Sequence, residues 1–235
     1  MSDPATRESR HVRRMFDGIA RRYDFLNHLL SLNRDRAWRR RAAREAVADA
    51  PALILDLCGG TGDLALAVAE AAPARVICCD FSHEMLSRAE PKFARRGLHP
   101  RCRTVEADGL RLPFGDACFD AVTVGFGVRN FQDMDAGLRQ IRRVLRPGGR
   151  LVILEFSQPE RGAFGRLYRT YLSWLLPRIG DSVAGRQGPY AYLAQTIAGF
   201  PDPPALAGRI RDAGFGACGW TTHTGGIVAI HTAFR

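Results

Sequence analysis

Three acidic residues stand where the sequence is best suited to bind a ligand, each at the end of an expected strand. Asp56, Asp80 and Asp108 each end or directly follow an expected strand, and the carboxyl ends of parallel strands meet at one edge of a sheet. A carboxylate at the second strand end can accept hydrogen bonds from both hydroxyl groups of a ribose. Asp108 could accept a hydrogen bond from an adenine amino group, or could be only a turn or cap residue. Together the carboxylates indicate a nucleoside site.

A glycine cluster separates the first expected strand from a helical segment. Gly60, Thr61 and Gly62 form this cluster, where glycines allow close approach of a ligand and a helix N-terminus presents unpaired N–H groups. The fingerprint of nicotinamide cofactor sites would need a third glycine, and the chain has Ala65 there. A structural turn without a ligand is the alternative interpretation.

An acidic residue followed by alternate small residues resembles the first motif of S-adenosylmethionine (SAM) methyltransferases. Here these residues are Asp56, Cys58, Gly60 and Gly62. The acid suits a cofactor with a free ammonium group better than one with a pyrophosphate. The residues expected to bind SAM are Asp56, Gly60, Thr61, Gly62, Asp80, Asp108 and Gly109.

Strands and helices alternate through most of the chain, which is typical of a doubly wound parallel sheet. The expected strands are 53–57, 75–79, 102–107, 119–124 and 150–155, with a turn at 146–150 before the last of them. Two further strands, 217–222 and 227–233, predict a final antiparallel hairpin. Nicotinamide folds usually continue with parallel units, so this hairpin favours the α/β fold of class I SAM-dependent methyltransferases, a Rossmann-like, mostly parallel sheet of seven strands.

The N-terminal region is expected to be helical and to cover the ligand end of the sheet. Apolar residues recur at helical spacing over 8–22, a short helix and turn is expected over 23–33, and another helix over 34–48. The domain boundaries that follow are an N-terminal helical cap over 1–50 and a methyltransferase domain over 51–235.

Composition limits the classes of protein that remain. The 235 residues suit one domain with an appendage, or at most two small domains. Neither a secretory signal nor a membrane-spanning run is evident. The six cysteines form no C-x-x-C pair, so buried free thiols and no metal are expected. The net charge of +10 is concentrated in residues 1–44, which carry twelve arginines and five acidic residues. Such a segment suits an anionic membrane surface or nucleic acid.

Two longer segments resemble the signatures of the family that C-methylates menaquinone and ubiquinone precursors. One begins at Tyr23-Asp24 and ends at Trp38, and the other covers 143–157. Blocks at 126–130 and 224–231 are also similar, so the likeness extends from about residue 12 to the end. The chain departs from the family pattern in having Asp35 where His is usual, Gly125 where Ser often helps to hold SAM, and Asp108-Gly109 where Asn-Ala is common.

The resemblance implies methyl transfer from SAM to a ring carbon of a polyprenylated quinol. The acceptor would be demethylmenaquinol, or the ubiquinone precursor 2-methoxy-6-polyprenyl-1,4-benzoquinol. A quinol is an electron-rich carbon nucleophile, and SAM already carries a reactive sulfonium, so no metal is expected. Arg129 could stabilise a developing phenolate or could form a structural salt bridge, and Asn130 and Tyr192 are weaker candidates for contacts with the quinol oxygens.

Residues 163–177 combine aromatic and aliphatic residues with arginines. They could form an amphipathic helix that covers the pocket or enters a membrane interface, or they could pack in the core. The expectation is a cytoplasmic protein in peripheral contact with the inner face of the cytoplasmic membrane. The sequence does not distinguish a menaquinone-only role from a dual role and says nothing of oligomeric state.

Two other classes of protein compete with this interpretation. A nucleic-acid methyltransferase acting on a base amine would have an Asn/Asp-Pro-Pro-aromatic block after the fourth strand, where this chain has 125–130, so no nucleic acid partner is expected. A non-catalytic binding module would not need the intact residues Gly60, Gly62, Asp80 and Asp108.

Overall fold

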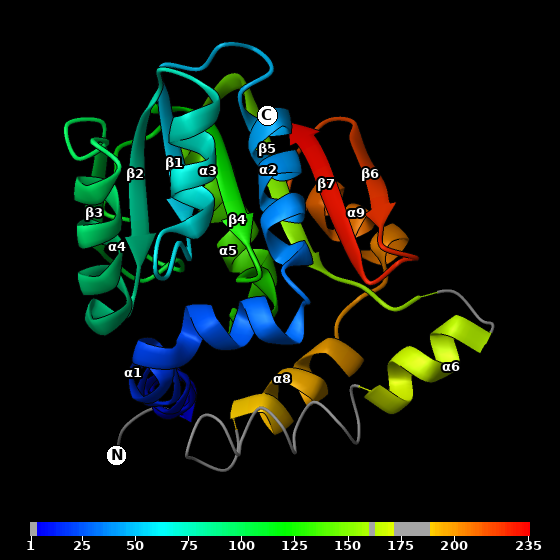
Figure 1. The fold of residues 1–235 in the computed structure, drawn as a ribbon. Coiled ribbons are helices and arrows are strands. Elements are labelled where there is room, and N and C mark those ends of the chain that lie inside the picture. The colour runs from blue at the N-terminus through cyan, green and yellow to red at the C-terminus, as the bar shows by residue number, and fades with distance from the viewer. Residues whose placement is uncertain (1–3, 160–162, 172–188) are drawn as a thin grey trace.

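A seven-stranded sheet forms the centre of the molecule (Figure 1), as seen in a computed structural model that describes residues 4–159, 163–171 and 189–235. The strand order is β3-β2-β1-β4-β5-β7-β6. The strands are β1 (Leu53–Leu57), β2 (Arg75–Asp80), β3 (Cys102–Glu106), β4 (Phe119–Gly125), β5 (Leu145–Phe156), β6 (Cys218–His223) and β7 (Val228–Phe234). The first five are parallel, and β7 is antiparallel to both β5 and β6. The predicted fold class is confirmed, final hairpin included.

Helices lie on both faces of the sheet and at its carboxyl edge (Figure 1). Among the described residues they are α1 (Pro4–Leu30), α2 (Arg34–Ala46), α3 (Asp63–Ala71), α4 (His83–Arg95), the short η1 (Val128–Asn130), α5 (Met134–Val144), α6 (Ala163–Thr170), α8 (Pro189–Ala198) and α9 (Pro203–Asp212). The expected break near residue 23 is wrong, because α1 continues to Leu30 and the chain turns only at 31–33. Tyr23, Leu26 and Leu30 pack in the same apolar cluster, which keeps this stretch helical.

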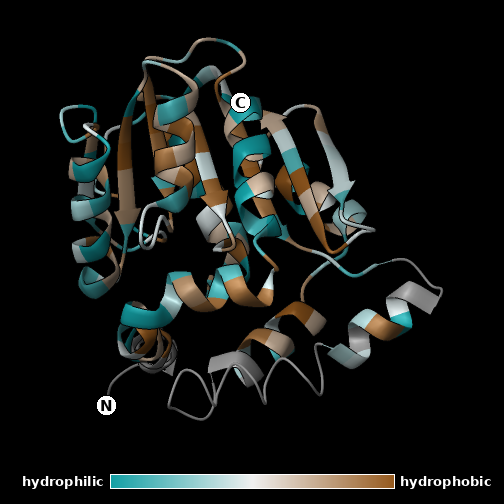
Figure 2. Cartoon of the chain, viewed as in Figure 1, coloured by the Kyte–Doolittle hydropathy of each residue, from teal (hydrophilic) through white to brown (hydrophobic). Residues whose placement is uncertain are grey.

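Alternate strand residues supply two separate apolar cores, as the pattern of a sheet covered on both faces requires. Ile54 and Val76 pack with α2, α3 and α4 on one face, whereas Leu55 and Val122 pack with α5 and α9 on the other. Figure 2 shows the apolar residues concentrated in the central strands. Trp38 of α2 belongs to the first of these cores. All six cysteines are free thiols.

The turn expected at 146–150 lies inside a strand. Leu145 already pairs with Phe119, and after a register shift Arg150 pairs with Ala121. Gly148 has φ +75°, a backbone conformation that glycine adopts more readily than other residues. The residues between Leu145 and Arg150 therefore form an irregularity within β5 instead of a connection before it.

A third apolar cluster joins α1, α6 and α8 beneath the carboxyl ends of the strands (Figure 1). Its buried members are Ile19, Leu26, Tyr168 and Ile197. Of the amphipathic segment expected at 163–177, α6 forms the first part and residues 172–177 lie outside the described residues. No described helix is long and apolar enough to cross a bilayer.

Candidate cofactor site

The expected ligand residues gather around a cavity of about 810 Å³ at the carboxyl edge of the sheet. Gly60, Asp80, Asp108 and Gly109 line this main cavity. A smaller cavity of about 310 Å³ lies beside the glycine turn and is lined by Asp56, Gly60 and Thr61. The structure therefore brings together strand ends that are 20 to 50 residues apart, as parallel topology requires.

The glycine turn after β1 depends on backbone conformations that favour glycine. Gly60 and Gly62 have φ of +54° and +82°. A Cβ on Gly62 would lie 2.8 Å from Cζ of Phe93, so the turn packs tightly against α4. A Cβ on Gly60 would meet no protein atom within 4 Å and would project into open space at the main cavity. Gly62 thus serves packing, and Gly60 leaves room for a ligand.

Asp80 ties the tip of β2 to this turn. Its side chain is buried and accepts hydrogen bonds from the backbone N–H of Gly60 and of Ser82, each at 2.9 Å. Burial raises the pKa of Asp80 to about 6, and the backbone N–H donors oppose that rise. The carboxylate is fixed at the cavity wall, where the hydroxyls of a ribose would meet it.

Asp56 is fully buried at the base of the smaller cavity. Oδ1 accepts a hydrogen bond of 2.7 Å from the Thr123 hydroxyl, whereas Oδ2 has no hydrogen-bond partner among the described residues. Burial raises the pKa of Asp56 to about 7, against the effect of Thr123. A buried carboxylate oxygen without a partner fits a ligand that brings an ammonium group.

Asp108 is exposed and lines the main cavity, and its Oδ1 accepts a hydrogen bond of 2.9 Å from the N–H of Leu110. It therefore shapes a turn as well as lining the cavity. The same cavity has an apolar lining that includes Phe81, Met85, Leu110 and Phe131. A cavity with an apolar lining and two carboxylates, Asp80 and Asp108, suits an adenosine, so the residues present fit SAM.

The serine that the family often has at Gly125 would be crowded here. Gly125 lines both cavities, and a Cβ at this position would lie 2.9 Å from Cδ2 of Leu64. A serine would need Leu64 to move.

Arg129 lines neither cavity and is engaged in an ion pair. Nη1 lies 2.8 Å from Oε1 of Glu155, with the two side chains 5% and 1% exposed. The guanidinium also lies over the ring of Phe156, 5.4 Å from its centroid, and its Nε has no hydrogen-bond partner among the described residues. Sequence reasoning gave no role to Glu155, although a carboxylate ending an apolar strand was the available signal.

The other two catalytic candidates contact each other. The Tyr192 hydroxyl donates to Oδ1 of Asn130 at 3.2 Å, which joins α8 to η1. Asn130 lines the main cavity. This pair is therefore placed at the edge of the site, one residue from Arg129.

Helix α1 forms a wall of the site. The sequence predicted a helical cap here but did not indicate which of its residues line the cavities. Tyr23 lines both cavities, and burial raises the pKa of its hydroxyl. Asp24 accepts a hydrogen bond of 2.5 Å from the Thr61 hydroxyl and pairs with Lys92 at 2.6 Å. The helix is thus bound to the glycine turn itself.

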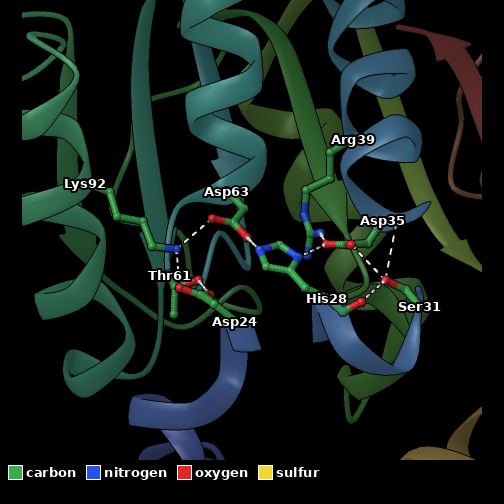
Figure 3. Close-up of polar contacts among 8 residues, drawn as sticks. All are labelled: Asp24, His28, Ser31, Asp35, Arg39, Thr61, Asp63 and Lys92. Atoms are coloured by element: carbon green, nitrogen blue, oxygen red, sulfur yellow. Dashed lines mark hydrogen bonds and ion pairs between the residues drawn. The ribbon is translucent and has the colours of Figure 1, made fainter. Parts of the chain in front are cut away.

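A network of charged side chains continues from Asp24 along the interface between α1, α2 and α3 (Figure 3). Lys92 also pairs with Asp63 at 2.6 Å, and Nδ1 of His28 lies 2.8 Å from Asp35. Ligand atoms of His28, Asp35 and Asp63 lie within 4.8 Å of one another. Because Lys92 and Arg39 already neutralise these carboxylates, the described cluster is an ion-pair network, and we assign no metal to it.

Solved structures share this architecture. A SAM-dependent methyltransferase from Thermotoga maritima superposes with a TM-score of 0.64 over 94% of this chain and 99% of its own, at 14% identity. The sheet order and the final hairpin are those of the class I SAM-dependent methyltransferase fold.

The chain belongs to the ubiE/COQ5 methyltransferase family, whose model matches residues 5–235. It is 49% identical over 222 residues to the demethylmenaquinone methyltransferase of Thermus thermophilus, covering 94% of this chain and 100% of that one. It is 49% identical over 205 residues to that of Deinococcus radiodurans, covering 87% and 84%. The family predicted from the sequence signatures, and with it SAM as the methyl donor, is confirmed.

Substitution of the two glycines of the turn should affect SAM binding and protein stability to different extents. Gly60→Ala should lower stability only by the cost of a left-handed alanine, about 1–2 kcal/mol, and weaken SAM binding at least about tenfold because its Cβ enters the cavity. Gly62→Ala should destabilise more, because its Cβ also meets Phe93. Thermal unfolding and calorimetric SAM titration measure both effects.

Gly97→Ala is the matched control, with φ +65° and open space around its Cβ but no place in either cavity. It should show the strain cost and unchanged SAM affinity. Equal SAM affinity in Gly60→Ala and Gly97→Ala would contradict the placement of the cofactor.

The buried carboxylates should make the stability of the ligand-free protein depend on pH. A carboxyl pKa raised by folding contributes stability that is lost as pH rises, here through about 6 for Asp80 and about 7 for Asp56. Asp56→Asn removes one of these ionisations, so its melting temperature should fall less between pH 5 and pH 8 than that of the unmodified protein. Gly97→Ala, which removes no carboxylate, should keep the original slope, and an unchanged slope in Asp56→Asn would refute the argument.

Proposed function

We propose that this enzyme transfers the methyl group of SAM to a ring carbon of demethylmenaquinol, and so produces menaquinol. The near-full-length identity to proteins named demethylmenaquinone methyltransferase carries this proposal. The apolar walls of the main cavity are consistent with a cofactor and a quinol ring held in contact with each other.

Bound SAM would supply an electrophilic methyl group. The protein's part is to align the acceptor carbon with that methyl group and to exclude water. We propose that the adenosine part of SAM binds in the main cavity, against Gly60, Asp80, Asp108 and Gly109. Three residues at the glycine turn, Asp56, Thr61 and Gly62, would support that part and bind the amino-acid end of SAM. Helix α1 covers this site through Tyr23, which keeps the reacting groups out of bulk water.

The acceptor must lose a phenolic proton as its ring carbon attacks. A guanidinium does not act as a base at neutral pH, so we assign to Arg129 the stabilisation of the developing phenolate, directly or through a water molecule. The ion pair with Glu155 holds the guanidinium in place. Asn130 and Tyr192, joined by a hydrogen bond, are proposed to contact a quinol oxygen.

The reaction is tested with labelled SAM and two chemically reduced, short-tail acceptors, demethylmenaquinol and a methoxy-prenyl-benzoquinol. We expect label in the naphthoquinol, and little or none when the same compound is supplied as the quinone. Arg129→Lys should reduce turnover about 100-fold or more, within the range for loss of one donor to an oxyanion. Absence of label in both quinols, despite SAM binding, would refute the acceptor assignment.

We further propose peripheral contact with the cytoplasmic membrane, which a polyprenylated substrate requires. Phe25, Leu29 and Leu32 are 60%, 43% and 79% exposed at successive turns near the end of α1. Leu167 of α6 is 68% exposed, and the hydroxyl of Tyr171, which follows α6, donates to the backbone oxygen of Leu30 at 2.9 Å. Exposed arginines accompany these apolar residues, at positions 21 and 22 of α1, at position 34 where α2 begins, and at position 166 of α6.

Sedimentation with vesicles containing anionic lipid at low salt tests this contact. The triple change Phe25→Ser, Leu29→Ser and Leu32→Ser should weaken vesicle binding about tenfold or more, because three apolar side chains no longer enter the interface. Trp220→Ser, at an exposed aromatic residue of β6, is the control and should bind normally. Sedimentation that does not change when vesicles are added would exclude the contact.

A further inference from the structure

The smaller cavity beside the glycine turn differs in character from the main cavity. Arg39, Asp56, Thr61 and Asp63 supply its polar lining. It adjoins the main cavity, because both are lined by Tyr23, Cys58, Gly60 and Gly125. A ligand that fills the main cavity with its nucleoside can therefore extend a polar end past the turn into the smaller one.

Arg39 is the cation of this smaller cavity, and its position is fixed. Its side chain is 10% exposed and pairs with Asp35 one helical turn earlier, which is itself only 4% exposed. Its guanidinium lies over the ring of Phe126, 5.4 Å from the centroid. Figure 3 shows Arg39 reaching from α2 towards the end of α1, with Asp35 beside it.

Asp35 is itself held in place by two further contacts. Oδ2 lies 2.8 Å from Nδ1 of His28, and Oδ1 accepts a hydrogen bond of 2.8 Å from the hydroxyl of Ser31. Lys92, and not Arg39, makes the close ion pair with Asp63. The bond to Asp35 uses Nη1, one nitrogen of a guanidinium with five N–H donors, so the group retains capacity for a planar anion.

The smaller cavity thus presents a guanidinium and a buried carboxylate, Asp56, whose Oδ2 has no hydrogen-bond partner among the described residues. Opposite charges within one small cavity complement a zwitterion. The amino-acid end of SAM is such a group, with an α-carboxylate and an α-ammonium.

We propose that Arg39 binds the α-carboxylate of SAM, while the ammonium lies on the side of Asp56. This inference rests on the assignment of the main cavity to adenosine. It gives the first turns of α2 a part in cofactor binding that the glycine motif does not reveal. It also gives Asp35 a positioning role, because that carboxylate orients the guanidinium without touching the cofactor.

Calorimetric titration with SAM and with decarboxylated SAM tests the proposal. The second ligand lacks only the carboxylate and keeps the ammonium and the sulfonium. The unmodified protein should prefer SAM by about 10- to 100-fold, the range for a hydrogen bond to a charged group. Arg39→Gln should lose most of this preference and bind decarboxylated SAM with unchanged affinity, which also shows that the variant is folded.

Two variants serve as controls. Arg40→Gln, at an exposed neighbouring arginine of α2, should retain the full preference. Asp80→Asn should lower the affinity for both ligands equally, because the ribose is common to both. Should Arg39→Gln leave Asp35 uncompensated and the protein unstable, the double variant Asp35→Asn, Arg39→Gln removes the buried charge and should show the same loss of preference.

Equal weakening of both ligands by Arg39→Gln, or an unchanged preference for SAM, would overturn the proposal. These outcomes are independent of the methyl acceptor. An enzyme that methylates neither quinol but retains an Arg39-dependent preference for SAM would contradict the proposed function and support the carboxylate site.

Discussion

The two hydrogen bonds accepted by Asp80 hold the ligand end of this molecule together. One fixes the glycine turn after β1 through Gly60, and the other fixes Ser82 at the start of α4. The Ser82 hydroxyl donates in turn to Asp17 of α1 at 2.5 Å. A single buried carboxylate therefore links two strand ends and, through one further residue, the helix that covers them. Because burial disfavours the charged form, this carboxylate is held at a cost that the backbone donors offset.

Helix α1 is attached mainly by polar contacts at the site and by apolar contacts away from it. Asp24 and His28 join the charged network that includes Lys92, Asp63 and Asp35. Leu26 instead packs with α6 and α8. Partly buried ion pairs add little net stability, but each constrains the relative position of the two groups that it joins. The network thus fixes where α1 lies over the cavities, and with it the position of Tyr23.

Arg129 can form a structural salt bridge and also stabilise a phenolate, and its pair with Glu155 shows how the two roles are compatible. The guanidinium is in a buried salt bridge, as the structural interpretation expected. A buried, oriented cation beside Asn130 is also what stabilisation of a developing negative charge requires, since preorganised charges need no rearrangement during reaction. The salt bridge would then be the means by which the cation is positioned, and the phenolate role stays a proposal.

The sequence by itself determined the sheet, the glycine turn and the family. Strand alternation, acidic residues at strand ends and glycines at positive φ are local signals, because each depends on a few neighbouring residues. Signature segments such as 143–157 identify relatives without any knowledge of where they fold.

Only the tertiary structure decided which distant side chains meet. Arg39 was one arginine among many in a basic segment, and its burial beside Phe126 follows from the packing of α2 against the sheet. Glu155 and Arg129 are joined because β4 and β5 are adjacent in the sheet order, which composition does not encode. The unbroken course of α1 was likewise decided by contacts with α6 and α8, since apolar packing between elements overrides weak local helix signals.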